Sequence, residues 1–198
     1  VPVTYGGKAL HNVMNCLPAV LSTYFWRDIE IEDIKLALQT FVPSSAQTPG
    51  RLNMFQFKHF QFLVDFAHNP AGLELLCDFI SKLDGEPKVG IISGTGDRRD
   101  EDIKELGRIS GRSFDEIIIR QDKNLRGRTA EEIVNLLVEG INETKTKDIP
   151  IEIIYNEKEA IMHAYNNAKP GSLITIMCDV VAEALDLIKG LKEKEDAE

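Results

Sequence analysis

The stretch FQFLVDFAHNPAGLELL, residues 60–76, indicates how the rest of the chain is organised. Its first five residues are mostly apolar and predict a short strand, which Asp65 closes. Asn69 is a favoured helix N-cap and Pro70 suits the first helical position, so a helix should follow. Asp65, His68 and Asn69 would then lie in the crevice at the carboxyl end of a strand, where open α/β sheets bind ligands.

Beyond this stretch, strand-like and helix-like patterns alternate to the end of the chain. The expected strands cover residues 88–92, 116–120, 151–155 and 173–177, and the expected helices cover residues 70–83, 100–110, 130–142, 158–168 and 180–192. Strands separated by helices imply right-handed crossovers. We therefore predict an α/β fold with a doubly wound, mainly parallel, Rossmann-like sheet covered on both faces.

Two features at the edges of this pattern carry further expectations. Residues 51–57 lead into a strand that is tightly joined to the strand at 60–64, which predicts an added β-hairpin or antiparallel edge. The tail, residues 192–198, is charged and is expected to fray.

The first 43 residues are too few and too helical to form a domain alone. Residues 1–5 look strand-like, and helices fit residues 8–24 and 32–40. Residues 41–50 contain two prolines, a glycine and several small polar residues, which predicts a linker. We therefore divide the chain into a helical remnant of another domain, residues 1–43, and a complete domain, residues 44–198.

Composition narrows the class of protein. The 198 residues carry a net charge of −9, which argues against general binding to nucleic acid. No apolar run reaches transmembrane length and no signal peptide is visible, so no membrane partner is expected. The cysteines, Cys16, Cys77 and Cys178, show no metal spacing and are expected to be buried free thiols in a reducing compartment, the cytoplasm.

The hexapeptide D-F-A-H-N-P, residues 65–70, resembles the C-terminal-domain motif of the Mur ligase superfamily, whose members join a carboxylate to an amine with ATP. Taken alone, Asp65 would only turn the chain, Asn69 would only cap the helix, and His68 would be a surface imidazole. The resemblance implies that Asp65 contacts the ribose of ATP. It also places His68 and Asn69 in the ATP site, without a chemical step.

Two further segments match the same superfamily. Residues 7–19 follow the pattern G-x-x-x-x-N-x-x-N-x-L-x-A, which resembles the last helical segment of the family's central domain, although Pro18 replaces the usual alanine and should disturb the helix. The resemblance implies that Asn15 contacts the adenine; otherwise it is a surface amide. Arg51, after Gly50, matches a family arginine that reaches the nucleotide, and its planar fork suits phosphate oxygens.

Two charged loops resemble one branch of the superfamily, which adds arginine to the side-chain carboxylates of an aspartate polymer. They are GDRRDED, residues 96–102, and DKNLRGR, residues 122–128. Both follow neighbouring segments of the same expected sheet, so they can face one crevice. The candidates for the arginine substrate are Asp97, Asp100 and Glu101 for its guanidinium and Arg126 and Arg128 for its α-carboxylate.

A structural explanation of these loops stands beside the functional one. Asp97 or Asp100 could cap a helix, and Arg98 could pair with Asp102 across one turn. Thr129 with Glu132 three residues later predicts a capping box.

The resemblance implies the C-terminal portion of an ATP-dependent acid–amino-acid ligase that works through an acyl phosphate. The chain begins at Val1 and has no G-x-x-x-x-G-K-[ST] phosphate loop, so we expect that loop upstream and the isolated piece to be inactive. ATP and Mg²⁺ are the expected cofactors, with the Mg²⁺ ligands mainly upstream. Arginine, an aspartate-backbone polymer and upstream domains are the expected partners.

Two alternatives remain at this point: another Mur-type ligase, of peptidoglycan or folylpolyglutamate synthesis, and a non-catalytic nucleotide-binding module. The oligomeric state stays open, a homo-oligomer included. No residue is assigned the chemical step, and no metal ligand is expected in this chain.

Overall fold

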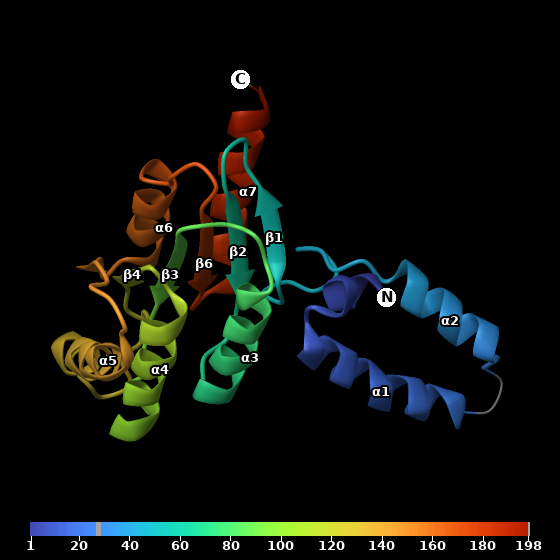
Figure 1. Cartoon of the computed structure of the whole chain (residues 1–198). Helices are drawn as coiled ribbons and strands as arrows, with labels where there is room; N and C mark the ends of the chain where they lie inside the picture. Colours follow the sequence, from blue (N-terminus) through green and yellow to red (C-terminus); the bar gives the residue numbers. More distant parts are fainter. Residues whose placement is uncertain (27–28, 198) are drawn as a thin grey trace.

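A six-stranded sheet organises the larger part of the chain, and a two-helix arm extends from it (Figure 1). The computed structural model describes residues 1–26 and 29–197. The arm contains the 3-10 helix η1 (Pro2–Gly7) and the helices α1 (Leu10–Tyr24) and α2 (Ile31–Thr40). The strands are β1 (Asn53–Gln56), β2 (Gln61–Asp65), β3 (Lys88–Ile92), β4 (Glu116–Ile119), β5 (Ile151–Ile153) and β6 (Leu173–Met177). The helices between and after them are α3 (Pro70–Ser81), α4 (Asp100–Ser113), α5 (Ala130–Thr144), α6 (Glu157–Asn166) and α7 (Val181–Ala197).

The strand order is β1-β2-β6-β3-β4-β5. Every neighbouring pair is parallel except β1 and β2, which form an antiparallel hairpin at one edge. The predicted fold class, a mainly parallel α/β sheet with an antiparallel edge, is therefore confirmed. The crossovers bring the carboxyl ends of β2, β6, β3 and β4 to one edge of the sheet, which is where the loops of interest lie.

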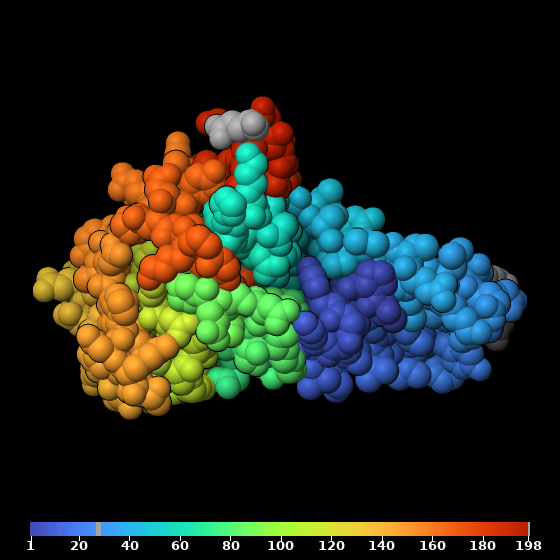
Figure 2. Space-filling view, turned by 45° about the horizontal axis from the view of Figure 1, so that its top comes forward, coloured from blue at the N-terminus to red at the C-terminus, as the bar shows by residue number. Residues whose placement is uncertain are grey.

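Both faces of the sheet are buried, because successive side chains of a strand point to opposite sides. In β2, Leu63 packs into the core beneath α3, α4 and α5, whereas Phe62 and Val64 pack into the core beneath α6 and α7. The continuous apolar run that predicted this strand is thus explained by helices on both faces. The space-filling view shows the arm, in blue, projecting from one side of this layered part (Figure 2).

The prediction of a strand at residues 1–5 is wrong, because these residues form η1. Thr4 donates hydrogen bonds from its backbone N and its hydroxyl to the carbonyl oxygen of Val1, which closes a local turn. Tyr5 then donates from its hydroxyl to the carbonyl oxygen of Leu52, at 2.5 Å. The segment therefore turns locally instead of pairing with the sheet.

The expected fraying of the tail is also wrong for the residues that the structure describes, since α7 continues to Ala197; residue 198 lies outside them. Lys192 pairs with Glu195 and with Asp196 one turn on. Glu195 also accepts a hydrogen bond from the backbone N of Lys58, at 3.0 Å, which ties the tail to the β1–β2 connection.

The cysteines follow their prediction only in part. Cys77 and Cys178 are buried free thiols, whereas Cys16 is partly exposed on α1.

Candidate functional site

A cavity of about 500 Å³ lies where the arm meets the sheet. Its walls come from α1, from the turn before β1, from the end of β2 and from the start of α3. All of the residues predicted to contact ATP line this one cavity: Asn15, Arg51, Asp65, His68 and Asn69. Residues up to 54 positions apart in the sequence are thus brought to one place, as the ATP-site hypothesis requires.

Asp65, the last residue of β2, is 7% exposed, and it anchors the turn that carries Arg51. Its Oδ2 accepts a hydrogen bond from the backbone N of Leu52, at 2.9 Å. Burial raises the pKa of Asp65, while this bond and the charge of Arg51 oppose the rise. The backbone N–H groups of Ala67 and Phe66 also lower the pKa of Asp65, so a ligand hydroxyl would share the carboxylate with several backbone donors.

Arg51 is exposed at the cavity wall and makes no ion pair within residues 1–26 and 29–197. Its guanidinium carbon lies 6.0 Å from the centre of the Phe66 ring, which packs against the ring of His68 with centroids 4.8 Å apart. A cation with free donors beside a cavity can bind an anionic group such as a phosphate.

His68 and Asn69 are both partly committed to the backbone. Asn69 is the N-cap of α3, as predicted, and its Oδ1 accepts a hydrogen bond from Gly72 N at 2.8 Å. The His68 Nδ1 lies 3.0 Å from the carbonyl oxygen of Phe66 and must donate, because a carbonyl only accepts. That tautomer leaves Nε2 of His68 as a hydrogen-bond acceptor.

The two asparagines of α1 differ in role. Asn12 donates from Nδ2 to the carbonyl oxygen of Val3, at 2.9 Å, so it holds η1 against the helix. Asn15 is exposed and lines the cavity, where its amide can offer both a donor and an acceptor.

The two charged loops lie together, as their positions in the sequence predicted, but their charges pair with one another. Arg126 donates to Asp97 at 2.8 Å, and Arg128 donates to Asp100 at 2.6 Å. The Arg126 guanidinium lowers the pKa of the Asp97 carboxyl. Glu101 instead accepts from Arg108 on α4, at 2.5 Å.

Part of the structural explanation of these loops is wrong. The residue that precedes α4 is Arg99, with no side-chain cap, so neither Asp97 nor Asp100 caps the helix. Arg99, rather than Arg98, pairs with Asp102, at 2.8 Å. The capping box of Thr129 and Glu132 is confirmed.

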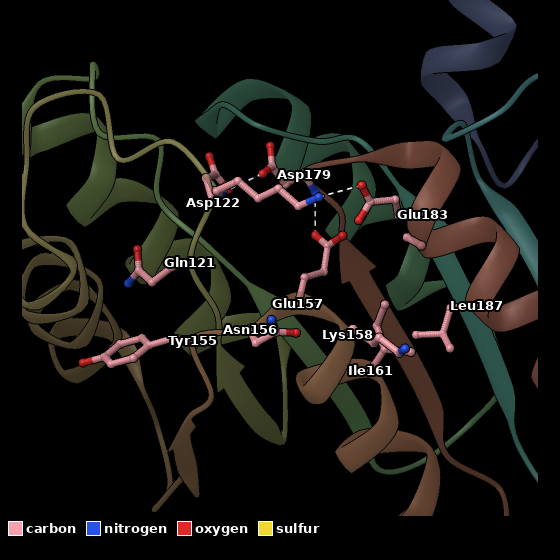
Figure 3. Close-up of a pocket in the computed structure, with 12 residues that line it drawn as sticks. Gln121, Asp122, Tyr155, Asn156, Glu157, Lys158, Ile161, Asp179, Glu183 and Leu187 are labelled. Atoms are coloured by element: carbon pink, nitrogen blue, oxygen red, sulfur yellow. Dashed lines mark hydrogen bonds and ion pairs between the residues drawn. The ribbon is translucent and has the colours of Figure 1, made fainter.

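Sequence reasoning missed a second cavity, of about 530 Å³, at the carboxyl ends of β4, β5 and β6 (Figure 3). Beneath it lies Arg120, which is 1% exposed and is the largest fully buried side chain of the described residues. Its guanidinium contacts Asp122 at 2.6 Å, Glu157 at 3.1 Å and the carbonyl oxygen of Met177. Burial raises the pKa of Glu157, and the charge of Arg120 opposes that rise.

The rim of this cavity carries further charges. In Figure 3, the carboxylates of Glu157 and Glu183 point toward one another, and the Asp179 carboxylate lies beside them but points the other way. Lys123 donates from its backbone N to Asp179, at 2.9 Å, and its ammonium pairs with Glu183, at 2.5 Å. The one sequence signal for this site was the arginine that ends the apolar run EIIIR, directly before the DKNLRGR loop.

The described part of the chain shows neither a membrane-spanning helix nor a clustered metal site. No helix there is both long and apolar enough to cross a membrane. No group of three or more His, Cys, Asp or Glu side chains there is placed to hold a metal ion. Of the residues that line the first cavity, where the arm meets the sheet, Asp65 alone carries a carboxylate, so this wall does not fit a complete Mg²⁺ site.

Comparisons with known proteins agree with the motifs. Residues 50–179 match the family model described as Mur ligase, glutamate ligase domain. The chain is 40% identical over 188 residues to a cyanophycin synthetase of Crocosphaera subtropica, which covers 95% of the chain and 21% of that protein. It is 28% identical over 161 residues to the UDP-N-acetylmuramoyl-L-alanyl-D-glutamate--2,6-diaminopimelate ligase of Aquifex aeolicus, covering 81% of the chain and 31% of that protein.

A solved structure shares the fold. E. coli FolC in complex with ADP superposes with a TM-score of 0.63 at 18% identity, over 84% of this chain and 36% of that one. The chain therefore spans about a fifth of the length of the cyanophycin synthetase and about a third of the other two proteins.

Proposed function

The chain belongs to the Mur ligase family, because residues 50–179 match a domain of that family. From that premise we propose that the chain works as the C-terminal part of a cyanophycin synthetase. The complete protein would use ATP to add arginine to the side-chain carboxylates of an aspartate polymer, and this chain would supply part of the site. The terminal phosphoryl group of ATP passes to the carboxylate and ADP is left. The α-amine of arginine then attacks the acyl phosphate, so that an amide forms and phosphate departs.

The observation that supports this proposal most is the convergence of Asn15, Arg51 and Asp65 on one cavity. We propose that Asn15 contacts the adenine, that the Asp65 carboxylate accepts a ribose hydroxyl, and that Arg51 binds phosphate oxygens. His68 and Asn69 complete the wall, with the acceptor Nε2 of His68 facing a hydroxyl or amine. The phosphate loop and the Mg²⁺ ligands would come from upstream parts of the same protein.

The division of the chain at residue 43 is part of the proposal. Residues 1–43 supply the α1 wall of the cavity, and residues 44–198 supply the wall formed by the turn, β2 and α3. In the complete protein, the first segment would be the end of a central ATP-binding domain, and the nucleotide would lie between the two domains.

We propose two places where the arginine substrate could bind, and the first is the pair of charged loops predicted from the sequence. The pairs Asp97–Arg126 and Asp100–Arg128 offer both signs of charge within one loop cluster. An incoming arginine could exchange partners with such a pair, its guanidinium with the aspartate and its carboxylate with the arginine.

The other place is the second cavity. Asp179 and Glu183 lie at its rim, where a guanidinium would displace only the exposed ammonium of Lys123. We therefore extend the candidates for the guanidinium to these two carboxylates.

The nucleotide assignment is tested in the full-length protein. Replacing Arg51 or Asp65 by alanine removes a charge-assisted contact of roughly 1.5–3 kcal/mol, which predicts a loss of about ten- to hundredfold in arginine-dependent ADP release. Arg112→Ala is the matched control, because Arg112 is an exposed arginine that pairs with Glu74 outside the cavity. Activity of the Arg51 and Asp65 variants equal to that of the control would contradict the assignment.

The substrate assignment needs a separate measurement. Asp97→Asn, Asp100→Asn, Glu101→Gln, Arg126→Ala, Arg128→Ala, Asp179→Asn and Glu183→Gln are compared by their Michaelis constants for arginine and for lysine. At least one acidic variant should lose the preference for arginine, because a carboxylate can pair bidentately with a guanidinium but not with an ammonium. Unchanged constants in all seven variants would exclude both locations. ADP release that depends on diaminopimelate or glutamate instead of arginine would favour a peptidoglycan or folate ligase.

A further inference from the structure

His11 lies on α1 in the wall of the ATP-site cavity, although no motif assigns it a role. Its Nδ1 is buried and has no hydrogen-bond partner within the described residues. Nε2 is not buried in this way, and it too makes no hydrogen bond there. One ring nitrogen is therefore enclosed by the protein, whereas the other keeps access to solvent on a side chain that lines the cavity.

The enclosed nitrogen determines which form of the imidazole is stable. A proton on Nδ1 would create a buried N–H without an acceptor, an arrangement that native structures rarely contain. Burial also lowers the pKa of His11, which favours the neutral ring. Of the nearby charges, Asp78 opposes this shift and Lys82 reinforces it, and these two pair with each other at 2.6 Å. His11 is thus neutral at pH 7 with its proton on Nε2, so it offers the cavity one uncharged donor.

The rest of the cavity indicates what this donor meets. Arg51 and Asp65, at the β2 side, suit phosphate and ribose, whereas the α1 and α3 side combines Asn15 with apolar Leu75 and Leu76. A flat, uncharged heterocycle with ring acceptors fits an apolar wall that bears a neutral donor, while a phosphate would require charge. We propose that His11 donates a hydrogen bond from Nε2 to a ring nitrogen of the bound purine and so selects the nucleotide base. This inference rests on the proposed function, because it takes the cavity to be the ATP site.

The test uses the full-length protein and titration calorimetry with ATP and its 1-deaza, 3-deaza and 7-deaza analogues. Each analogue replaces one ring nitrogen by C–H. For the wild type, one analogue should bind about three- to tenfold more weakly than ATP, the range expected for one neutral hydrogen bond. His11→Phe should bind ATP more weakly than the wild type by a similar factor, and it should bind the same analogue as tightly as it binds ATP. His11→Gln, which keeps an N–H donor at a similar reach, should restore part of the difference.

The ratio of analogue to ATP is taken within each protein, so a partly unfolded variant does not distort it. His59→Phe is the matched control, because His59 is exposed in the β1–β2 connection, and it should keep the wild-type ratios. If His11→Phe keeps the wild-type ratios for all three analogues, the role of His11 is overturned and the proposed function is left standing. A wild-type protein that binds no ATP would overturn the proposed function and this inference with it.

Discussion

Replacing the buried Arg120 by methionine tests whether the second cavity depends on a charge network. The methionine side chain keeps most of the apolar volume of the arginine stem but removes the guanidinium. Asp122 and Glu157 then lose their cation, and the carbonyl oxygen of Met177 loses its donor.

The size of the effect follows from burial. Removing one partner of a buried ion pair costs about 3–5 kcal/mol, because the other charge stays desolvated. The side chains of Asp122 and Glu157 are 11% and 15% exposed, so water reaches them in part and the lower end of that range applies. A loss of about 3 kcal/mol corresponds to a fall in Tm of roughly 6–12 °C for a protein of this size.

The loss of stability in Arg120→Met should depend on pH, and the titration of Glu157 determines whether it grows or shrinks as the pH falls. Burial holds the folded pKa of Glu157 above its ordinary 4.5, and without Arg120 that pKa rises further. The folded state then binds the proton more tightly than the unfolded state, so stability increases as pH falls through the folded pKa toward 4.5. Arg120→Met should therefore be most destabilised at pH 7–8 and should recover progressively on acidification.

Urea unfolding of both proteins at several pH values between 5 and 8 measures this difference. In the structure, Asp179 N donates to Glu157 Oε2 at 2.6 Å. Adding Glu157→Gln to the variant removes the buried carboxylate, while the new amide oxygen can still accept this hydrogen bond. The double variant should be more stable than Arg120→Met at pH 8. A loss that is constant across the pH range, or a double variant no more stable than the single one, would refute the reasoning.

Two further predictions concern packing and capping. A Cβ at Gly140 would lie 2.0 Å from the carbonyl oxygen of Lys104, so Gly140→Ala must force α4 and α5 apart; we expect thermal unfolding to show a loss of more than about 3 kcal/mol. Gly190→Ala is its control, since beyond the neighbouring backbone of its own helix no atom lies within 4 Å of the added Cβ, and it should gain roughly 0.5–1 kcal/mol of helix stability. Thr129→Ala removes the side-chain acceptor of the α5 capping box and should cost about 1 kcal/mol in urea unfolding, whereas Thr129→Ser should cost much less.

The features that the sequence by itself determined are those that depend on interactions between residues close together in the chain. The apolar run before Asp65, the cap at Asn69 and the capping box at Thr129 act over a few residues, so their elements form where the pattern predicts. The alternation of such elements was enough to infer a mainly parallel sheet with an antiparallel edge. Residues 1–5 failed the same reasoning because the backbone turns at Tyr5 and Gly6, which have left-handed φ angles of 50° and 67°, so the segment closes into η1 and is not extended as a strand is.

The tertiary structure decided which distant residues meet. The position of the arm against β2 and α3 brings Asn15 and His11 into one cavity with Arg51 and Asp65. The crossovers that order the strands bring Arg126 to Asp97. They also bury Arg120 between Asp122 and Glu157. Caps and periodicity arise from contacts a few residues apart, whereas charge pairing follows distance in space, and the folded sheet alone determines that distance.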